Sequence, residues 1–269
     1  MKINWDSEVL SSVSKAVDQL EHLSINKDSI ESVANWLAYE EFPMPSSAAV
    51  RDDADDFIRA TMFMNTLNFA FTDFDKSIKY EVNEDGKILS DSEAMYFQVN
   101  NAISSGVQLT DGNEMASISL QQLKNIFVGN IEMPMLKERV EILNEVGQKL
   151  VDSYEGDWIN FINNGPKKLY SDGGGLIERL IEEFPRFDDS SQFKGSNVKF
   201  YKLAQLAFWV IHAELSGSNY FKIEDMNSMT AFADYIIPVA LNLKNITAYN
   251  PQLDKKIKSG VLIERDTDE

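Results

Sequence analysis

Apolar residues recur at three- and four-residue spacing along most of the chain, which is the period of an amphipathic helix. Residue 134 is a proline, a residue favoured in the first turn, and it is expected to open a long helix. The face of that helix carries Leu136, Val140, Leu143, Val146 and Leu150. The same pattern predicts further helices over residues 8–23, 28–39, 57–71, 120–127, 176–184, 198–215, 227–243 and 251–259.

The period changes near residues 77–90. Here the segments SIKYEV and GKILS flank NEDG, whose Asp85-Gly86 pair is a turn signal. A small β-hairpin is therefore predicted near 77–90. The chain has no internal repeat and no long linker rich in Pro, Gly or Ser, so we expect a mainly α protein, with one helical domain over residues 1–269.

Composition places the chain among ordinary globular proteins, with 43% hydrophobic residues and a mean hydropathy of −0.27. No apolar run reaches the ~20 residues that cross a bilayer. The first residues, MKINWDSEVLSSVSKAV, are amphipathic and contain acids, so they resemble neither a signal nor a transit peptide. The absence of cysteine rules out disulfides, thiolate metal sites and a cysteine nucleophile. A cytoplasmic protein is expected.

Charge and histidine content narrow the chemistry further. The net charge is −18, with 43 acids against 25 bases, so polymeric nucleic acid is disfavoured as a partner, whereas a small ligand with one phosphate fits. The two histidines are His22, expected to be solvated in a polar helix, and His212, expected to be packed on an apolar helix. Carboxylates are therefore the expected catalytic groups, with no metal site and no cofactor.

Asp234 is the most unusual of these carboxylates. It lies in SMTAFADYIIP, between Phe232 and Tyr235, within a predicted apolar helix. Burying an unpaired carboxylate costs several kcal/mol. Asp234 is therefore either a hydrogen-bonded structural acid or part of a site that stacks a flat ligand and offers it a carboxylate.

Other polar residues in apolar surroundings leave two readings open. Asn65 and Asn68 are three residues apart and are expected to share one helical face, in a structural or a ligand-facing role. Tyr201 and Lys202 are neighbours on a predicted core helix, where the lysine either reaches solvent or supplies a cation for a phosphate.

Arg139 and the glycines at 173–175 are expected to have structural roles. Arg139 is expected to pair with nearby glutamates on its helix. The triple glycine at 173–175 precedes a helix, as in an anion site, but the segment lacks the lysine and hydroxyl of a phosphate-binding loop. A flexible loop leading into the helix is the better interpretation.

Five segments in a fixed order resemble the queuosine salvage proteins, the queuosine 5'-phosphate N-glycosylase/hydrolase family. They are NTLNFAF (65–71), ISLQQLKNIF (118–127), MPMLKERVEILNEVG (133–147), VKFYKLAQL (198–206) and MTAFADYIIP (229–238), and the resemblance spans about 57 to 262. It implies a helical fold akin to DNA glycosylases, acting on a nucleotide monomer. The implied reaction hydrolyses the N-glycosidic bond of queuosine 5'-monophosphate and releases queuine for salvage into tRNA.

The resemblance also implies roles for individual residues. Asp234 matches the acid of the family's FADY motif, which contacts the base, and is the catalytic candidate. Phe232 and Tyr235 would pack on the flat ring. Asn68, Tyr201 and Lys202 complete the expected substrate-binding set, at the pocket wall and the phosphate end.

The chain also departs from the family pattern. Ile236 stands where the family commonly has arginine, and residues 207–210 replace an expected acid. The family pattern continues past the position of Glu269 into an acid-containing segment, so we expect a short, divergent member or a second chain that completes the C-terminal part. Two alternatives stay open: a catalytically impaired homologue that binds a queuine-like base or nucleotide, and a nucleosidase of different base specificity.

Overall fold

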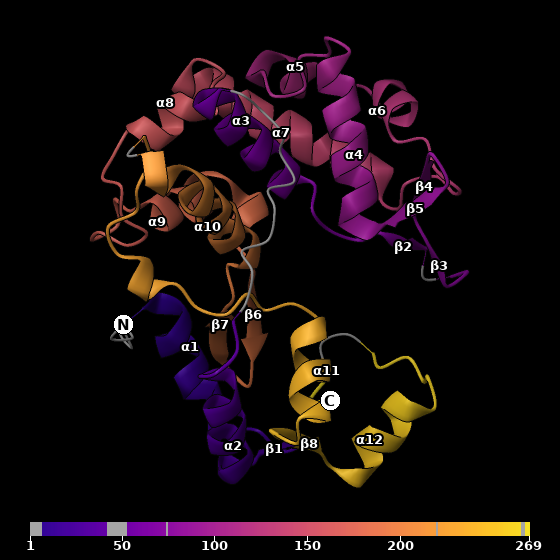
Figure 1. The fold of residues 1–269 in the computed structure, drawn as a ribbon, viewed down its shortest axis with the longest axis vertical. Coiled ribbons are helices and arrows are strands. Elements are labelled where there is room, and N and C mark those ends of the chain that lie inside the picture. The colour runs from indigo at the N-terminus through magenta and orange to yellow at the C-terminus, as the bar shows by residue number, and fades with distance from the viewer. Residues whose placement is uncertain (1–6, 42–52, 74, 219, 265–266) are drawn as a thin grey trace. The chain divides into compact units, whose positions relative to one another are not determined.

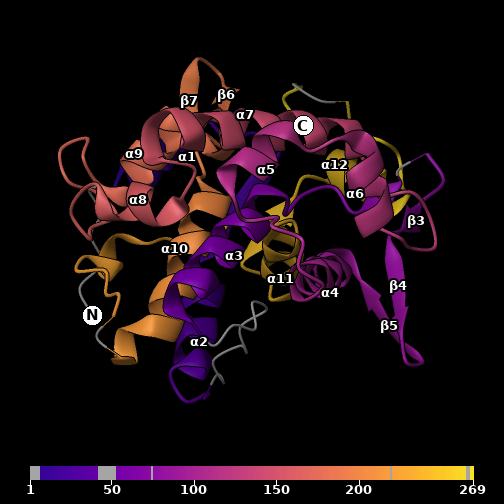
Figure 2. The ribbon, with the colours of Figure 1, turned by 90° about the horizontal axis from the view of Figure 1, so that it is seen from above.

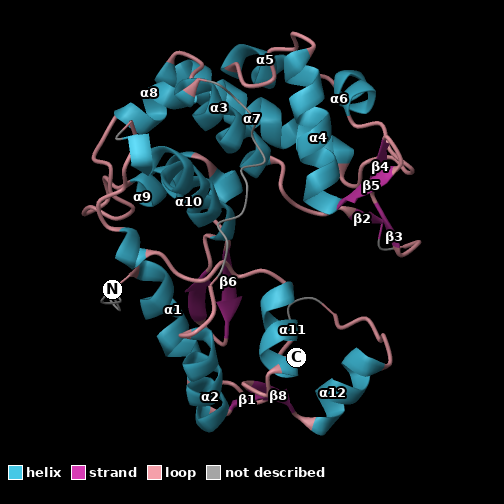
Figure 3. Cartoon of the chain, in the orientation of Figure 1, coloured by secondary structure: helices cyan, strands magenta, loops and turns pink. Residues whose placement is uncertain are grey.

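The computed structural model describes residues 7–41, 53–73, 75–218, 220–264 and 267–269 (Figure 1). Helices account for most of the ordered elements, and the strands form short antiparallel pairs (Figure 3). The predicted mainly α class is confirmed. Within the described residues, no helix has both the length and the apolar character needed to cross a membrane.

The chain divides into two compact units. Unit 1 comprises Met1–Ile3, Ser46–Asp189 and Leu203–Met229, and unit 2 comprises Asn4–Pro45, Ser190–Lys202 and Thr230–Glu269. The chain thus passes between the units several times, and the expectation of a single domain over 1–269 stays a prediction.

Unit 1 contains most of the helices. Its elements are α3 (Ala54–Thr66), β2 (Thr72–Asp73), β3 (Ile78–Lys79), β4 (Glu81–Glu84), β5 (Lys87–Ser90), α4 (Asp91–Ser104), α5 (Gly112–Ser117), α6 (Leu120–Ile126), α7 (Leu136–Tyr154), α8 (Trp158–Asn163), α9 (Leu176–Glu183) and α10 (Lys202–Leu215), whose first residue belongs to unit 2. Short 3-10 turns occur at Pro185–Phe187, Ser216–Ser218 and Met226–Ser228.

The core of unit 1 combines aromatic packing with close helix contacts. The Trp158 ring lies 4.8 Å from that of Phe184, and both side chains are buried. Helix α5 packs on α7, as both views show (Figures 1 and 2). Glycine is required at this contact, because a Cβ on Gly147 would lie 2.7 Å from the carbonyl oxygen of Gly112. The apolar pattern of α10 is explained by its many buried residues.

Unit 2 consists of shorter elements. They are α1 (Glu8–Val17), β1 (Leu23–Ile25), α2 (Lys27–Leu37), β6 (Ser190–Phe193), β7 (Ser196–Lys199), α11 (Ile236–Leu243), β8 (Thr247–Tyr249) and α12 (Pro251–Lys258). Strand β1 pairs antiparallel with β8, and β6 pairs with β7 in a hairpin that packs on α1.

Several local predictions are confirmed. The hairpin near 77–90 is β4 and β5, with Asp85 and Gly86 in the turn at positive φ. Ser119 caps α6 together with Gln122. His212 is half-buried, and its Nδ1 accepts the N–H of Ile223 at 2.9 Å.

Four element predictions are wrong at their ends. Helix α1 stops at Val17, so His22 lies outside a helix, with Nδ1 2.8 Å from Asn250 Nδ2. Helix α3 ends at Thr66, before Asn68. Residues 198–199 pair with β6, so α10 begins only at Lys202, and residues 229–234 form no helix, so α11 begins at Ile236. Apolar runs fit both a strand and a helix, which explains the third error.

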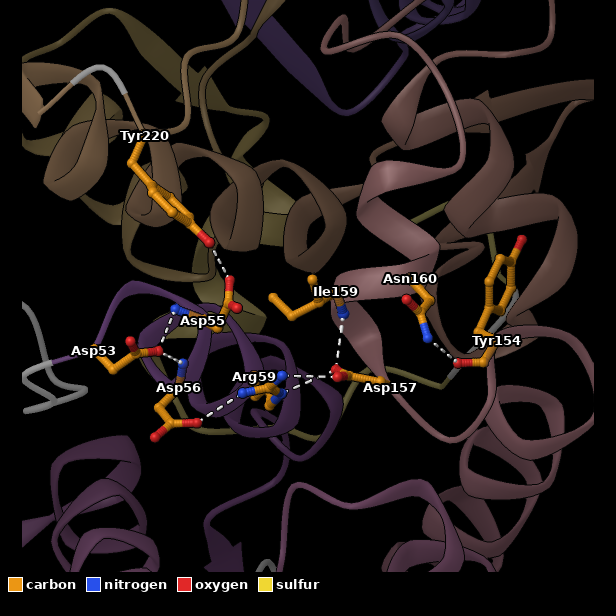
Figure 4. Close-up of polar contacts among 9 residues, drawn as sticks. All are labelled: Asp53, Asp55, Asp56, Arg59, Tyr154, Asp157, Ile159, Asn160 and Tyr220. Atoms are coloured by element: carbon orange, nitrogen blue, oxygen red, sulfur yellow. Dashed lines mark hydrogen bonds and ion pairs between the residues drawn. The ribbon is translucent and has the colours of Figure 1, made fainter.

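Acidic residues fix the start of α3 (Figure 4). Asp53 Oδ1 accepts the N–H groups of Asp55 and Asp56, at 2.9 and 3.1 Å, as an N-cap does. The Tyr220 hydroxyl donates to Asp55, which ties the segment after α10 to this helix. Arg59 lies one turn further along α3 and donates to Asp56.

Arg59 also joins α3 to the start of α8. Its Nε and Nη2 donate to the two carboxylate oxygens of Asp157, at 2.9 and 2.7 Å, while Asp157 Oδ1 caps α8 by accepting the Ile159 N–H (Figure 4). Burial alone would raise the pKa of Asp157, but the hydrogen bonds from Arg59 and Ile159 outweigh it and lower the pKa below its ordinary value.

Asp157→Ala is expected to lower the free energy of unfolding by about 2 kcal/mol at neutral pH, because a cap and a bidentate ion pair are both lost. Since the folded-state pKa of Asp157 is lowered, its contribution is complete above the unfolded-state pKa and disappears as the pH falls through the folded-state pKa. Urea unfolding at several pH values should therefore show the difference between wild type and variant shrinking in acid. Asp56→Ala is the control, because Asp56 contacts the same arginine from an exposed position. An equal loss in both variants would contradict the assignment.

Candidate functional site

Asp234 lies in unit 2, in the irregular segment that precedes α11. Its Oδ1 accepts the N–H of Ile236 at 3.0 Å, and its Oδ2 lies 2.8 Å from Lys202 Nζ. The side chains of Asp234 and Lys202 are 30% and 23% exposed. The expectation of a carboxylate in the middle of an apolar helix is therefore wrong, and Asp234 is an ion-paired acid within reach of solvent.

The surroundings of Asp234 favour its charged form. Burial raises its pKa, but the hydrogen bonds from Lys202 and from the Ile236 N–H, with the Lys202 charge, outweigh that effect and lower the pKa below its ordinary value. Asp234 is thus a carboxylate at neutral pH. Such a group stabilises positive charge or accepts a hydrogen bond, and is poorly suited to donate a proton.

The aromatic neighbours of Asp234 differ in exposure. Phe232 is half-buried, and its carbonyl accepts the Asp234 N–H at 2.7 Å, which turns the backbone tightly at this point. Tyr235 is 71% exposed. The motif therefore contains a carboxylate followed in sequence by an exposed aromatic residue, a combination that suits a flat, polar ligand.

Lys202 reaches Asp234 from a corner between a strand and a helix. Tyr201 has a φ of +49° and is 2% exposed, and Lys202 follows as the first residue of α10. The expectation that both residues lie on the core helix is wrong for Tyr201. The structure brings Lys202 and Asp234 together, although many residues separate them in sequence.

Comparison with known proteins places these residues in a family. The family model described as queuosine salvage protein matches residues 48–269, a range that includes Tyr201, Lys202 and Asp234. The chain belongs to this family.

Individual relatives agree with the family match. Proteins named queuosine 5'-phosphate N-glycosylase/hydrolase are similar to the chain at 30% identity over 213 residues in Mus musculus, 29% over 201 in Bos taurus and 26% over 252 in Sphaerobacter thermophilus. These matches cover 78%, 74% and 93% of this chain, and 62%, 58% and 76% of the relatives. The chain thus spans about three-fifths of the length of the mouse and cattle proteins.

The two candidate asparagines do not share a helical face. Asn65 is in α3 and donates to the Thr61 carbonyl at 2.9 Å, as a structural side chain does. Asn68 follows the end of α3 and donates to the Tyr96 hydroxyl at 2.9 Å. Asn68 belongs to unit 1, whereas the other candidates belong to unit 2, and its ligand-facing role stays a prediction.

Arg139 has a role that the sequence interpretation missed. It is fully buried on α7 and donates to the carbonyls of Pro134, Leu67, Phe69 and Ala70, so the expectation of pairing with glutamates is wrong. Burial and the nearby Arg186 lower its pKa to about 10. The sequence did contain a signal for this burial. Arg139 lies three residues after Leu136 and four residues before Leu143, and residues at these spacings share one face of a helix.

The triple-glycine segment behaves as a loop that leads into α9. Glu178 Oε2 accepts the N–H groups of Ser171 and Gly175, at 2.6 and 2.8 Å. The chain's own carboxylate therefore occupies the position that an external anion would take.

A cavity of about 510 Å³ opens elsewhere in unit 1. It lies between the β2–β3 turn and the start of α7, with Thr72, Lys76, Met133 and Glu138 among its lining residues. Its lining contains none of the candidate residues, and its mixed charges partly cancel, as in the ion pair of Lys76 with Asp73. Asp234 is preferred to this cavity as the candidate because it is held as a carboxylate by Lys202 and the Ile236 N–H.

Proposed function

We propose that the chain is an enzyme that hydrolyses the N-glycosidic bond of queuosine 5'-monophosphate and releases queuine for salvage into tRNA. The observation that carries the proposal is Asp234, a partly exposed carboxylate held by Lys202 and followed in sequence by the exposed Tyr235. It occurs in a chain whose family model spans residues 48–269. The relatives bear the corresponding name.

The chemistry follows from the charge that develops during cleavage. As the base leaves with the bonding electrons, positive charge builds on the sugar, and a fixed carboxylate stabilises it. Water then adds its oxygen to the anomeric carbon, one of its protons is lost, and the departing base takes up a proton. Asp234 supplies the negative charge or orients the polar edge of queuine, while Phe232 and Tyr235 pack on the ring.

Lys202 supports a nucleotide rather than a nucleoside as substrate. Its side chain is 23% exposed and its ammonium is paired with Asp234, so a substrate phosphate would find a cation there. Transfer of Lys202 from Asp234 to the phosphate would leave the carboxylate to act on the sugar or base. Asn68 remains a proposed substrate-binding residue, whereas the burial of Tyr201, which is 2% exposed, favours a role behind Lys202 over direct contact with the substrate.

The ion pair also favours one alternative. While Lys202 neutralises Asp234, the site has less negative charge to offer a cationic transition state, so a homologue that binds a queuine-like base or nucleotide without turnover is the second candidate. A change of base specificity is a further variant of the enzyme proposal, because Ile236 borders the motif at a position that would contact the ligand.

The proposed setting is a cytoplasmic protein with a small-molecule nucleotide substrate and no polymeric nucleic acid. The net charge of −18 supports the last point, and the lack of cysteine is compatible with a reducing compartment.

Incubation of the purified chain with queuosine 5'-monophosphate, the unphosphorylated nucleoside and guanosine 5'-monophosphate tests these proposals. We expect free queuine, detected by mass spectrometry, from the monophosphate and at least tenfold less from the nucleoside, since about 1.4 kcal/mol of phosphate binding is worth that factor. A rise in melting temperature with queuine, without release of queuine from any substrate, would favour the binding alternative. Release of guanine alone would favour a different base specificity.

A further inference from the structure

A polar contact between α1 and the end of β7 fixes Lys199 in unit 2. The Lys199 Nζ lies 2.8 Å from Glu8 Oε2, and the backbone N–H of Lys199 donates to Ser12 Oγ at 2.9 Å. Ser12 is buried, with 7% of its surface exposed. Both the side chain and the backbone of Lys199 are therefore attached to α1.

The same lysine holds Tyr201. Its Nζ lies 5.7 Å from the centre of the Tyr201 ring, and its side chain is hydrogen-bonded to the Tyr201 side chain. Tyr201 is 2% exposed and has a φ of +49°, a left-handed conformation that is unfavourable for residues with large side chains. Surrounding contacts must maintain such a conformation, and Lys199 supplies two of them.

The left-handed residue marks the corner at which β7 ends and α10 begins. Strand β7 ends at Lys199, and α10 starts at Lys202. A change in the backbone of Tyr201 would therefore redirect the chain at Lys202. Because Lys202 Nζ lies 2.8 Å from Asp234 Oδ2, a small displacement is enough to break the pair.

We propose that Lys199 and Tyr201 are positioning residues for the Lys202–Asp234 pair. Helix α1 fixes Lys199, Lys199 fixes the ring and hydroxyl of Tyr201, and the left-handed Tyr201 sets where Lys202 meets Asp234. The burial of Tyr201 supports action through Lys202 over direct contact with a ligand. The consequence for catalysis rests on the proposed function, whereas the geometry does not.

The test is an NMR titration of the Asp234 carboxyl carbon in the full chain, with the signal assigned by its loss in Asp234→Asn. Lys199→Met removes the ammonium and keeps the stem, and Tyr201→Phe removes one oxygen. Lys202→Met gives the largest shift the ion pair can produce. Lys194→Met is the matched control, because Lys194 pairs the tip of the same hairpin with Glu21.

We expect the Asp234 pKa to rise by roughly half a unit in Lys199→Met and Tyr201→Phe, which is part of the lowering that a close cation gives. Lys194→Met should leave it unchanged. In the queuine-release assay, the two variants should lose about fivefold in kcat with little change in KM, as expected for a misplaced group. Neither change would follow from a general loss of stability.

An Asp234 titration identical in all variants would overturn the proposal, as would an equal shift in Lys194→Met. If Lys199→Met fails to fold, the Asp234 titration in Tyr201→Phe alone tests the proposal, because this variant keeps the buried ring and loses only the hydroxyl. The titration is independent of turnover. Shifted titrations in a chain that releases no queuine would therefore refute the proposed function and leave the positioning role intact.

Discussion

Asp234→Asn is expected to reduce kcat for cleavage of queuosine 5'-monophosphate by roughly 100- to 1,000-fold, the range seen when one electrostatic stabiliser is removed. The amide has nearly the same shape and can still accept the Ile236 N–H, but it carries no charge. Because the carboxylate is partly exposed, the free energy of unfolding should change by less than about 1 kcal/mol. Initial rates of queuine release and urea unfolding measure the two effects.

Asp254→Asn is the matched control for this variant. Asp254 is also in unit 2, is ion-paired with Lys258 at 2.6 Å, and has a side chain that is 33% exposed, close to the 30% of Asp234. Its rate should equal that of the wild type. Full activity in Asp234→Asn, or an equal loss in both variants, would contradict a specific role for Asp234.

Arg139→Met is expected to have the largest effect on stability, lowering the free energy of unfolding by about 3–5 kcal/mol. Arg139 is fully buried on α7, and its guanidinium lies 4.3 Å from the centre of the Phe69 ring. Methionine would fill part of the volume but would leave the carbonyls of residues 67, 69, 70 and 134 without their donor. Urea denaturation of the full chain measures the loss.

Two further variants sharpen this prediction. Lys137→Met lies on the same helix at an exposed position and should change the free energy of unfolding by less than about 0.5 kcal/mol. Arg139→Lys keeps a buried charge with fewer donors, so it should be as harmful as the methionine variant. Wild-type stability in either Arg139 variant would refute the view that this guanidinium holds the segment after α3.

Much of the fold could be predicted because helix periodicity and turn chemistry are local properties. Asp85-Gly86 and the Ser119 cap identified the β4–β5 hairpin and the start of α6. The residues at which helices begin and end were harder to predict. Residues 198–199 continue the helical spacing of the segment that follows but pair with β6. The apolar segment around Asp234 gives no sign that helix α11 begins only after it.

The sequence indicated which residues to consider at the candidate site, but it did not indicate their geometry. The ordered motifs indicated Asp234 and Lys202, yet no local pattern indicates that the two side chains form an ion pair. That pair depends on the left-handed backbone of Tyr201, a conformation expected for glycine or asparagine rather than tyrosine. The incorrect prediction for Arg139 had a different cause. Its position among the apolar residues of α7 does indicate burial, but the sequence was interpreted as indicating pairing with glutamates.

The central claim is that the chain hydrolyses queuosine 5'-monophosphate and that Asp234 is required for the reaction. The most direct test is the reaction of the folded chain with this substrate in water enriched in oxygen-18. Mass spectrometry follows both products at equimolar enzyme and substrate. We predict free queuine, together with ribose 5-phosphate that carries oxygen-18 at the anomeric position, and far slower formation of both by Asp234→Asn. Intact substrate after prolonged incubation, or equal product from wild type and Asp234→Asn, would contradict the proposed reaction.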